Sequence, residues 1–121
     1  MASQLAVSVV DDDDSVRESM TELLRFCGFA VQAFASAEEF LASGRAADTQ
    51  CLILDVAMPG MSGPELYSEL RRRGQHVPTI FITAVMDESL RQQLFRQGAQ
   101  EFLYKPFSDA ALLQALERVT P

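Results

Sequence analysis

The sequence predicts an α/β fold in which five helices cover a parallel sheet of five strands. Five short apolar runs alternate with five segments whose apolar residues recur at helical spacing. Such alternation is typical of a parallel sheet with right-handed crossovers. Three of the runs are continuously apolar, as parallel strands covered on both faces should be. The chain has 121 residues, a length that suits one domain, so we expect a single domain over 1–121.

The predicted strands are short and evenly spread along the chain. The second is more mixed in polarity than the others, which favours a place at an edge of the sheet. We predict strands at Ala6–Asp11, Ala30–Ala35, Cys51–Asp55, Thr79–Thr83 and Glu101–Tyr104.

The predicted helices follow the strands, and their ends carry recognisable signals. The apolar stripe of the first helix runs from Val16 to Cys27, behind a capping box that Ser15 and Glu18 would form. Ser36 and Ser108 stand where the second and fifth helices begin, and serine is a common N-cap. Glycine ends the first four helices, as its left-handed conformation allows; the positions are Gly28, Gly44, Gly74 and Gly98.

Polar side chains follow four of the predicted strands, at the point where each strand ends. Asp11 and Asp12 close the first strand, and Asp55 closes the third. Thr83 closes the fourth strand, and Lys105 follows the fifth. Because the carboxyl ends of parallel strands share one edge, where ligands bind in open α/β sheets, we expect these five side chains to converge.

This set of side chains has a definite chemistry. Two carboxylates about 4 Å apart repel each other by roughly 4 kcal/mol at an effective dielectric constant near 20. A hard divalent cation relieves that repulsion, and Mg²⁺ prefers carboxylate and water oxygens. Asp55 is the candidate nucleophile, because carboxylates can form acyl phosphates. Lys105 and Thr83 could then bind phosphoryl oxygens as a point charge and a hydrogen-bond donor.

The charge balance argues against several other functions. The formal net charge is −7, with ten Lys and Arg against seventeen Asp and Glu, whereas nucleic-acid binding depends on neutralising phosphates. We therefore expect no direct nucleic-acid binding, and we assign Arg71–Arg73 to a solvated helix end. No apolar run approaches the roughly 20 residues of a membrane span. No signal peptide is recognisable, so a cytoplasmic location is expected.

The cysteines and the histidine offer no alternative site. Cys27 and Cys51 lack a CxxC partner, and a zinc site needs about four ligands. Without a secretion signal we expect two reduced thiols, with Cys51 in the core. His76 stands in a predicted loop away from the strand ends, which argues against a Ser-His-Asp triad.

From about Val7 to Val119 the chain resembles the receiver domains of two-component response regulators. The resemblance rests on Val9-Val10-Asp11-Asp12-Asp13, on Ile82-Thr83-Ala84 and on Lys105-Pro106-Phe107. The run Met58-Pro59-Gly60-Met61-Ser62-Gly63 soon after Asp55 is the most specific part. The residues of these motifs are similar to those of the subgroup that usually carries a helix-turn-helix DNA-binding output domain. The resemblance implies a flavodoxin-like fold with strand order 2-1-3-4-5.

The resemblance also implies a phosphorylation site with its metal. Asp55 would accept the phosphoryl group and, together with Asp12, would ligate Mg²⁺ directly. The carbonyl oxygen of Ala57 would be a third protein ligand, and Asp11 would act through a bound water.

Further residues would bind the phosphoryl group and transmit its presence. Thr83, Ala84 and Lys105 would hold the phosphoryl oxygens. Phe102 matches the switch aromatic, which turns inward as Thr83 moves. The peptide bond between Lys105 and Pro106 would be cis, an isomer found mainly before proline.

The implied function is a regulatory switch rather than an enzyme, apart from catalysis of its own phosphorylation and dephosphorylation. A sensor histidine kinase would dock on the first helix and the loop after the fifth strand, with Arg17, Thr21 and Arg25 carrying pairing specificity. Phosphorylation would promote a homodimer through the fourth helix, fifth strand and fifth helix. A stand-alone receiver and a piece of a longer regulator with a C-terminal DNA-binding domain both remain open.

Two positions where the family varies are apolar in this sequence. Ala57 lies two residues after Asp55, and Val85 lies two residues after Thr83. In relatives these positions tune hydrolysis of the acyl phosphate. Neither side chain can orient an attacking water by hydrogen bonding, so we predict slow to moderate self-dephosphorylation.

Three other functions are considered. A haloacid-dehalogenase-like phosphatase would use Asp11 as nucleophile and Asp13 as acid, but no second acidic pair follows Lys105. For Asp13 and Asp14 we expect only helix-capping or solvated roles. A receiver-like module that never takes phosphate would lack part of the acidic set, which is complete in this chain. A flavodoxin-like cofactor binder would need a Gly/Ser/Thr-rich phosphate loop where four aspartates stand.

Overall fold

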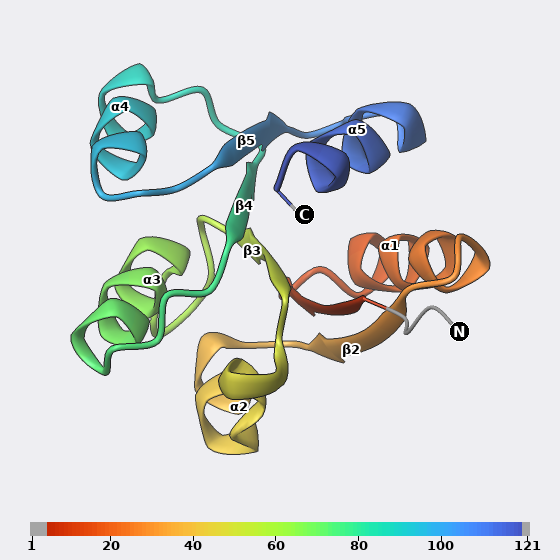
Figure 1. Cartoon of the computed structure of the whole chain (residues 1–121). Coiled ribbons are helices and arrows are strands. Elements are labelled where there is room, and N and C mark those ends of the chain that lie inside the picture. Colours follow the sequence, from red (N-terminus) through yellow and green to blue (C-terminus); the bar gives the residue numbers. More distant parts are fainter. Residues whose placement is uncertain (1–4, 120–121) are drawn as a thin grey trace.

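Five parallel strands form one sheet in the order β2-β1-β3-β4-β5 in the computed structural model, which describes residues 5–119 (Figure 1). The predicted α/β class and the flavodoxin-like strand order are confirmed. The ends of the expected domain over 1–121 lie outside the described residues. The strands are β1 (Ala6–Val10), β2 (Ala30–Phe34), β3 (Cys51–Asp55), β4 (Thr79–Thr83) and β5 (Glu101–Tyr104).

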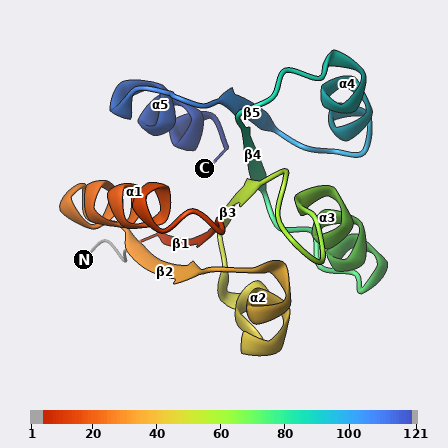
Figure 2. The same ribbon diagram turned by 180° about the vertical axis from the view of Figure 1, so that it is seen from behind.

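Helices cover both faces of this sheet. They are α1 (Asp14–Phe26), α2 (Ala37–Ser43), α3 (Gly63–Arg72), α4 (Glu88–Arg96) and α5 (Asp109–Val119), with a short 3₁₀ helix η1 (Arg45–Asp48) that was not predicted. Figures 1 and 2 show α1 and α5 on one side of the sheet and α2, α3 and α4 on the other. Within residues 5–119, no helix is long and apolar enough to cross a lipid bilayer.

The core consists of two apolar layers, one on each face of the sheet. Leu52, Leu54 and Phe81 belong to the layer under α2, α3 and α4. Ile53 and Ile80 belong to the layer under α1 and α5. Every residue of β3 and β4 is buried. Because both faces are covered, polar side chains on these strands can reach solvent only at the strand ends.

The edge position predicted for the second strand is confirmed. β2 pairs only with β1 among the described strands, and three of its five residues are exposed. β5 forms the opposite edge and pairs with β4. The two outer strands therefore flank β1, β3 and β4, and the clustered acidic residues lie at the ends of β1 and β3.

The beginning of α1 differs from the prediction. Asp13 is the N-cap, and its Oδ1 accepts a hydrogen bond from the backbone N–H of Val16 at 3.1 Å. The capping box predicted for Ser15 and Glu18 is wrong, because Ser15 already lies within the first turn of the helix. Asp13 caps the helix two residues before Ser15 because α1 begins at Asp14, directly after the turn that follows β1. The capping role expected for Asp13 is confirmed.

The other predicted caps behave as expected, and one was missed. Ser36 accepts from the N–H of Glu39 at 3.1 Å, and Ser108 accepts from the N–H of Ala111 at 3.0 Å. A full capping box between Ser62 and Glu65 begins α3. The Ser-x-x-Glu spacing was visible in the sequence, so the usual capping rule could have found it.

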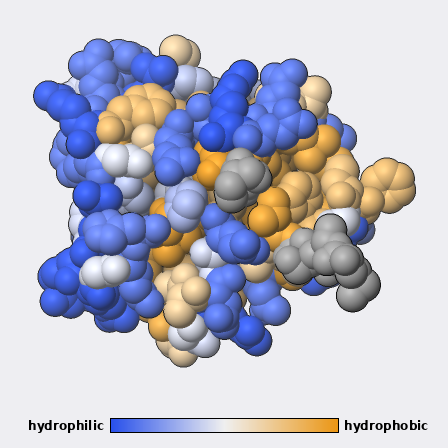
Figure 3. Space-filling view, viewed as in Figure 1, coloured by the Kyte–Doolittle hydropathy of each residue, from blue (hydrophilic) through white to orange (hydrophobic). Residues whose placement is uncertain are grey.

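The surface agrees with most of the expectations for single residues. Arg71–Arg73 and His76 are exposed, and the part of Figure 3 that corresponds to α3 is strongly hydrophilic. Cys51 is buried, and burial raises the pKa of its thiol to about 12. Cys27 is exposed, so its predicted place on the buried stripe of the first helix is wrong. It lies at the C-cap, one residue beyond the end of α1.

Candidate functional site

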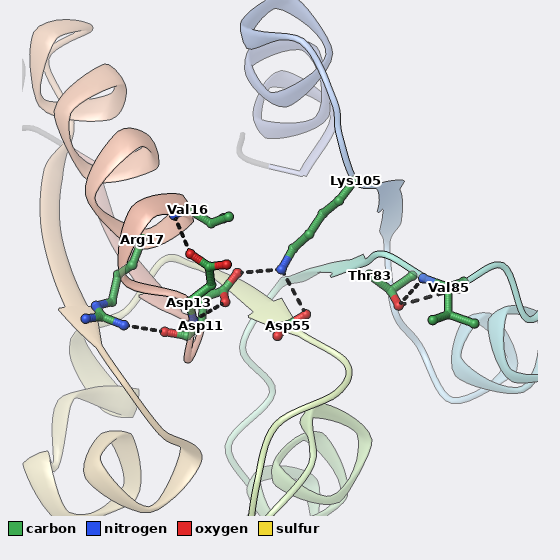
Figure 4. Close-up of polar contacts among 8 residues, drawn as sticks. All are labelled: Asp11, Asp13, Val16, Arg17, Asp55, Thr83, Val85 and Lys105. Atoms are coloured by element: carbon green, nitrogen blue, oxygen red, sulfur yellow. Dashed lines mark hydrogen bonds and ion pairs between the residues drawn. The ribbon is translucent and has the colours of Figure 1, made fainter.

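The carboxyl ends of four strands bring polar side chains together at one edge of the sheet. Asp11 follows β1 directly, and Asp55 is the last residue of β3. Thr83 ends β4, and Lys105 follows β5. Figure 4 shows Lys105 reaching from the end of β5 toward Asp11 and Asp55, with Thr83 on the neighbouring strand. The predicted convergence is therefore present for Asp11, Asp55 and Lys105, and Asp12 joins them.

Three carboxyl groups form the acidic part of the site. One carboxylate oxygen from each of Asp11, Asp12 and Asp55 lies within 4.8 Å of the other two. Asp11 is 0% exposed and Asp55 is 4% exposed, whereas Asp12 faces solvent. At such separations like charges repel strongly, particularly where burial reduces screening. The arrangement is stable only with cations close by.

Lys105 supplies one such cation. Its Nζ lies 2.9 Å from Asp11 Oδ2 and 3.3 Å from Asp55 Oδ1. Burial acts to lower the pKa of Lys105, but its hydrogen bonds and charge attraction to Asp11 and Asp55 outweigh that effect and raise the pKa above the usual value. The lysine is therefore fully charged and neutralises one of the three carboxylates.

Asp55 remains electrostatically unfavourable despite this lysine. Burial raises the pKa of its carboxyl group to about 6, and the charge of Asp11 adds to that rise. Lys105 works in the opposite direction but does not compensate. A cationic ligand that entered the site would lower the pKa of Asp55 again.

Thr83 is turned toward the loop that follows β4. Its Oγ1 accepts a hydrogen bond from the N–H of Val85 at 3.2 Å and lies 3.4 Å from the Val85 carbonyl oxygen. The side chains of Val85 and Met86 in this loop are largely exposed, at 65% and 78%. The hydroxyl of Thr83 is thus engaged with its own loop rather than with Asp55, as Figure 4 shows.

Phe102 lies among aromatic rings on the face of the sheet toward α4. Its ring centroid is 6.0 Å from that of Phe81, 6.3 Å from Phe95 and 5.6 Å from Tyr104. The side chain is half-buried. The peptide bond between Lys105 and Pro106, which follows β5, is cis.

The loop after β3 carries Ala57 and is held at two points. The N–H of Gly63 donates to the carbonyl of Val56 at 3.0 Å. Glu38, in the first turn of α2, accepts from the N–H of Met61 at 2.9 Å. Sequence reasoning missed Glu38, because it is 23 residues from Met61 and nothing local in the sequence indicates the contact.

The inner end of α1 is engaged with the site. The Nη1 of Arg17 donates to the carbonyl oxygen of Asp11 at 2.7 Å, and the side chain is only 18% exposed. Thr21 is buried. The expectation that these two residues belong to an exposed docking face is wrong, because α1 turns that side toward the sheet; of the three residues named for that face, only Arg25 is exposed.

Comparison with known sequences agrees with this geometry. A family model described as the response regulator receiver domain matches residues 7–117. The transcriptional regulatory protein FixJ of Azorhizobium caulinodans is 46% identical over 116 residues, covering 96% of this chain and 55% of that protein. Nodulation protein W of Bradyrhizobium diazoefficiens is 44% identical over 119 residues, covering 98% of this chain and 52% of that protein. The chain spans about half the length of these curated relatives.

Comparison with solved structures also identifies response regulators as similar to this chain. The response regulator StyR superposes with a TM-score of 0.90 at 45% identity, covering 98% of this chain and 60% of that one. The structure of FixJ-N superposes with a TM-score of 0.85 at 38% identity, covering 98% of this chain and 94% of that one. The sequence match over nearly the whole chain and the shared fold establish that this chain belongs to the response regulator receiver domain family.

Proposed function

We propose that this chain is a signalling switch that accepts a phosphoryl group on Asp55 from a phosphohistidine of a sensor kinase. A carboxylate oxygen of Asp55 would form the new bond to phosphorus while the bond between phosphorus and the histidine nitrogen breaks. The observation that carries the proposal is the buried Asp55, with Lys105 at 3.3 Å and two further carboxylates beside it. A buried carboxylate in such company is suited to metal-assisted phosphoryl transfer.

The acidic set fits Mg²⁺. Three carboxylate oxygens within 4.8 Å of one another are hard ligands of the kind that Mg²⁺ prefers. Asp12, Asp55 and the Ala57 carbonyl would hold the ion directly, and Asp11 would act through a water. When bound, the ion would neutralise charge between Asp55 and an incoming phosphoryl group.

The remaining side chains would bind the transferred group. Lys105 already contacts Asp55, and its ammonium group would shift to bind a phosphoryl oxygen. The Thr83 hydroxyl and the Ala84 N–H would approach other oxygens, for which Thr83 must release Val85. That release couples the phosphoryl group to the loop before α4, and Phe102 would follow from its place beside Phe95 of that helix.

Phosphorylation would act by shifting a conformational population. The group brings about −1.5 to −2 charges and strong hydrogen-bond acceptors. Only the conformer in which Thr83 turns toward Asp55 would bind these acceptors well, so that conformer gains population. The altered surface would be α4, β5 and α5, and it would drive homodimerisation.

A sensor kinase would dock beside the site rather than on the acidic cluster itself. A pocket of about 510 Å³ lies between α1 and the segment after β5. Its walls include Val16, Met20 and Phe107, and Lys105 and Ala84 of the site also line it. An apolar pocket that shares residues with the site would let a helix of the kinase present its phosphohistidine to Asp55.

The longer relatives suggest what the switch controls. The matched region covers only 55% and 56% of two relatives named as transcriptional regulatory proteins. We infer that a C-terminal DNA-binding domain is the output in a longer regulator. The chain itself, at a net charge of −7, would not bind nucleic acid directly.

The phosphatase alternative has no support. It requires Asp13 as an acid, but the carboxyl group of Asp13 is engaged in capping α1. It also requires Asp11 as a free nucleophile, but Asp11 is paired with Lys105 at 2.9 Å. Family membership over residues 7–117 points the same way.

Intact-mass measurement after incubation with Mg²⁺ and a small acyl phosphate donor tests the proposal, beside an Asp55→Asn control. We expect one phosphoryl group on the wild type and none on the control. A phosphoryl group that remains on the control would exclude Asp55 as the acceptor. Turnover of a generic phosphomonoester that Asp11→Asn abolishes would instead favour the phosphatase.

A further inference from the structure

The turn between β1 and α1 carries two of the three clustered carboxylates. Asp11 is the last residue of this turn that the sheet holds, through its N–H to the carbonyl oxygen of Phe34 at 3.2 Å. The chain then turns to enter α1 at Asp14. Asp12, at the apex, is exposed. The positions of the Asp11 and Asp12 carboxylates therefore depend on how this short turn is held.

Arg17 holds the turn from the helix that follows it. Its Nη1 donates to the carbonyl oxygen of Asp11 at 2.7 Å, and its Nη2 contacts Asp14 Oδ1 at 2.5 Å. Figure 4 shows the guanidinium group reaching back along the turn to Asp11. A guanidinium group is planar and presents its donors in a rigid fork, so two contacts restrict it far more than one.

The Asp11 carbonyl links Arg17 to the backbone of the acidic cluster. It belongs to the peptide plane that joins Asp11 to Asp12, and this plane is rigid. Fixing the plane restricts the backbone from which both side chains diverge. The Asp11 carboxylate is oriented separately, because its Oδ1 accepts from the N–H of Asp13 at 2.9 Å. Arg17 thus controls the part of the geometry that the side-chain contacts leave free.

We propose that Arg17 is a positioning residue for a divalent cation held by Asp11, Asp12 and Asp55. The inference rests on the proposed function, which requires such a cation. Arg17 acts through the main chain of the turn and does not touch the cation. Groups that orient the ligands of a metal commonly change its affinity by 10-fold or more when they are lost.

If the charge of Arg17 were decisive, its loss would change the affinity for a divalent cation in the opposite direction to the loss of a positioning residue. The direction of the change therefore tests the proposal. A cationic side chain near the cluster would repel a divalent cation, so removing it would tighten binding if charge were decisive. Asp14 is paired with the guanidinium group and offsets part of that charge. Weaker binding after loss of Arg17 would therefore reveal its positioning role.

The test is calorimetric titration of the whole chain with Mg²⁺. We expect Arg17→Gln to weaken Mg²⁺ binding about 10-fold. Arg17→Lys, which keeps the charge and one donor, should recover part of the loss. Asp14→Asn keeps the side-chain oxygen that accepts from Arg17 and removes only its charge, so it should stay within about 2-fold of the wild type.

A stability control separates positioning from general loss of folding. Val31→Ala trims a buried residue of β2 away from the site, and we expect its Mg²⁺ affinity to match the wild type. The Mg²⁺ concentration for half-maximal phosphorylation by a small acyl phosphate should rise about 10-fold in Arg17→Gln alone. A shift equal to that of Val31→Ala at similar stability would overturn the inference.

The outcomes for Arg17 and for the proposed function are distinguishable. Tighter or unchanged Mg²⁺ binding by Arg17→Gln overturns the positioning role, even if the wild type is phosphorylated normally. If the wild type binds Mg²⁺ but gains no phosphoryl group, the proposed function fails, and the affinities of the variants still decide the role of Arg17. A wild type that binds no Mg²⁺ overturns both.

Discussion

The buried carboxyl group of Asp55 lowers the stability of the fold at neutral pH. Its pKa in the folded protein is raised to about 6 by burial and by Asp11, whereas an unfolded aspartate has a pKa near 3.9. Below about pH 4 both states are protonated and the group has no effect. As the pH rises through 6, the folded state must ionise an unfavourably placed group. The fold therefore loses stability between these pH values and the loss is complete above them.

This linkage predicts a pH-dependent gain from Asp55→Asn. In metal-free protein at pH 7.5 the variant should be more stable by about 1–3 kcal/mol, because the unfavourable charge is gone. The gain should fade as the pH falls toward 4. Urea unfolding in the presence of a chelator measures it, with Glu22→Gln as an exposed control. A gain that does not change with pH would contradict the assigned cause.

We predict that two apolar residues influence the lifetime of the proposed phosphorylated state. Ala57 is exposed beside the site, and Val85 is 65% exposed in the loop after β4. Neither side chain can hydrogen-bond an attacking water, so hydrolysis should be slow to moderate.

Ala57→Asn would supply such a hydrogen bond. We expect it to speed the loss of the phosphoryl group by about 10-fold, a modest share of what a positioned polar group can contribute. Repeated intact-mass measurement after removal of the donor follows the decay. Ala57→Val controls for added bulk without a polar group. An unchanged decay rate in Ala57→Asn would refute the role of this position.

Among the elements, α3 begins in close contact with the end of β3 that carries Asp55. A Cβ atom built on Gly63, its first residue, would lie only 2.2 Å from the carbonyl oxygen of Asp55. The neighbour is backbone and cannot swing aside. Gly63 has no left-handed φ, so the close approach, not the conformation, is what requires glycine.

Gly63→Ala should therefore displace α3 from the end of β3. We expect it to lower the free energy of unfolding by about 2–3 kcal/mol, as overpacking does. Gly44→Ala is the matched control, because Gly44 has a φ of +69° but open space around it, and its cost should be about 1 kcal/mol. Chemical denaturation compares them. A smaller loss at Gly63 than at Gly44 would show that the loop relaxes freely.

Helix α4 buries little of its surface. Leu94 is its only buried residue, and the loop before it exposes Val85 and Met86. A helix with so little buried surface can shift at low cost. The looseness of α4 suits the proposed movement of the α4, β5 and α5 surface.

At the scale of the whole molecule, we predict dimerisation that depends on the phosphoryl group. Light scattering with Mg²⁺ and a phosphoryl mimic should show a dimer, and the unmodified chain should be monomeric. Arg118→Glu should weaken the dimer, because Arg118 of α5 is exposed and bonds Glu101 of β5 at 3.0 Å. Arg72→Glu on α3 is the control away from this face. Equal dimer content with and without the mimic would count against the prediction.

The sequence alone determined the order of elements and the residues that meet at the strand ends. Alternating apolar runs specify strands and helices, and the carboxyl ends of parallel strands lie at one edge of the sheet. The proximity of Asp11, Asp55 and Lys105 was therefore predictable from the sequence. The functional roles of these residues stay predictions. The caps at Ser36 and Ser108 were also predictable, since capping depends on residues within one turn.

Only the tertiary structure decided how the site is held. Asp13 rather than Ser15 caps α1, because the turn out of β1 sets where the helix can begin. Arg17 binds the Asp11 carbonyl, and Glu38 binds the loop after β3 from another helix. Local patterns report neighbours one or two turns away, whereas these contacts depend on how each crossover packs its helix against the sheet. The positions of the reactive groups follow from sequence, and their precise support follows from packing.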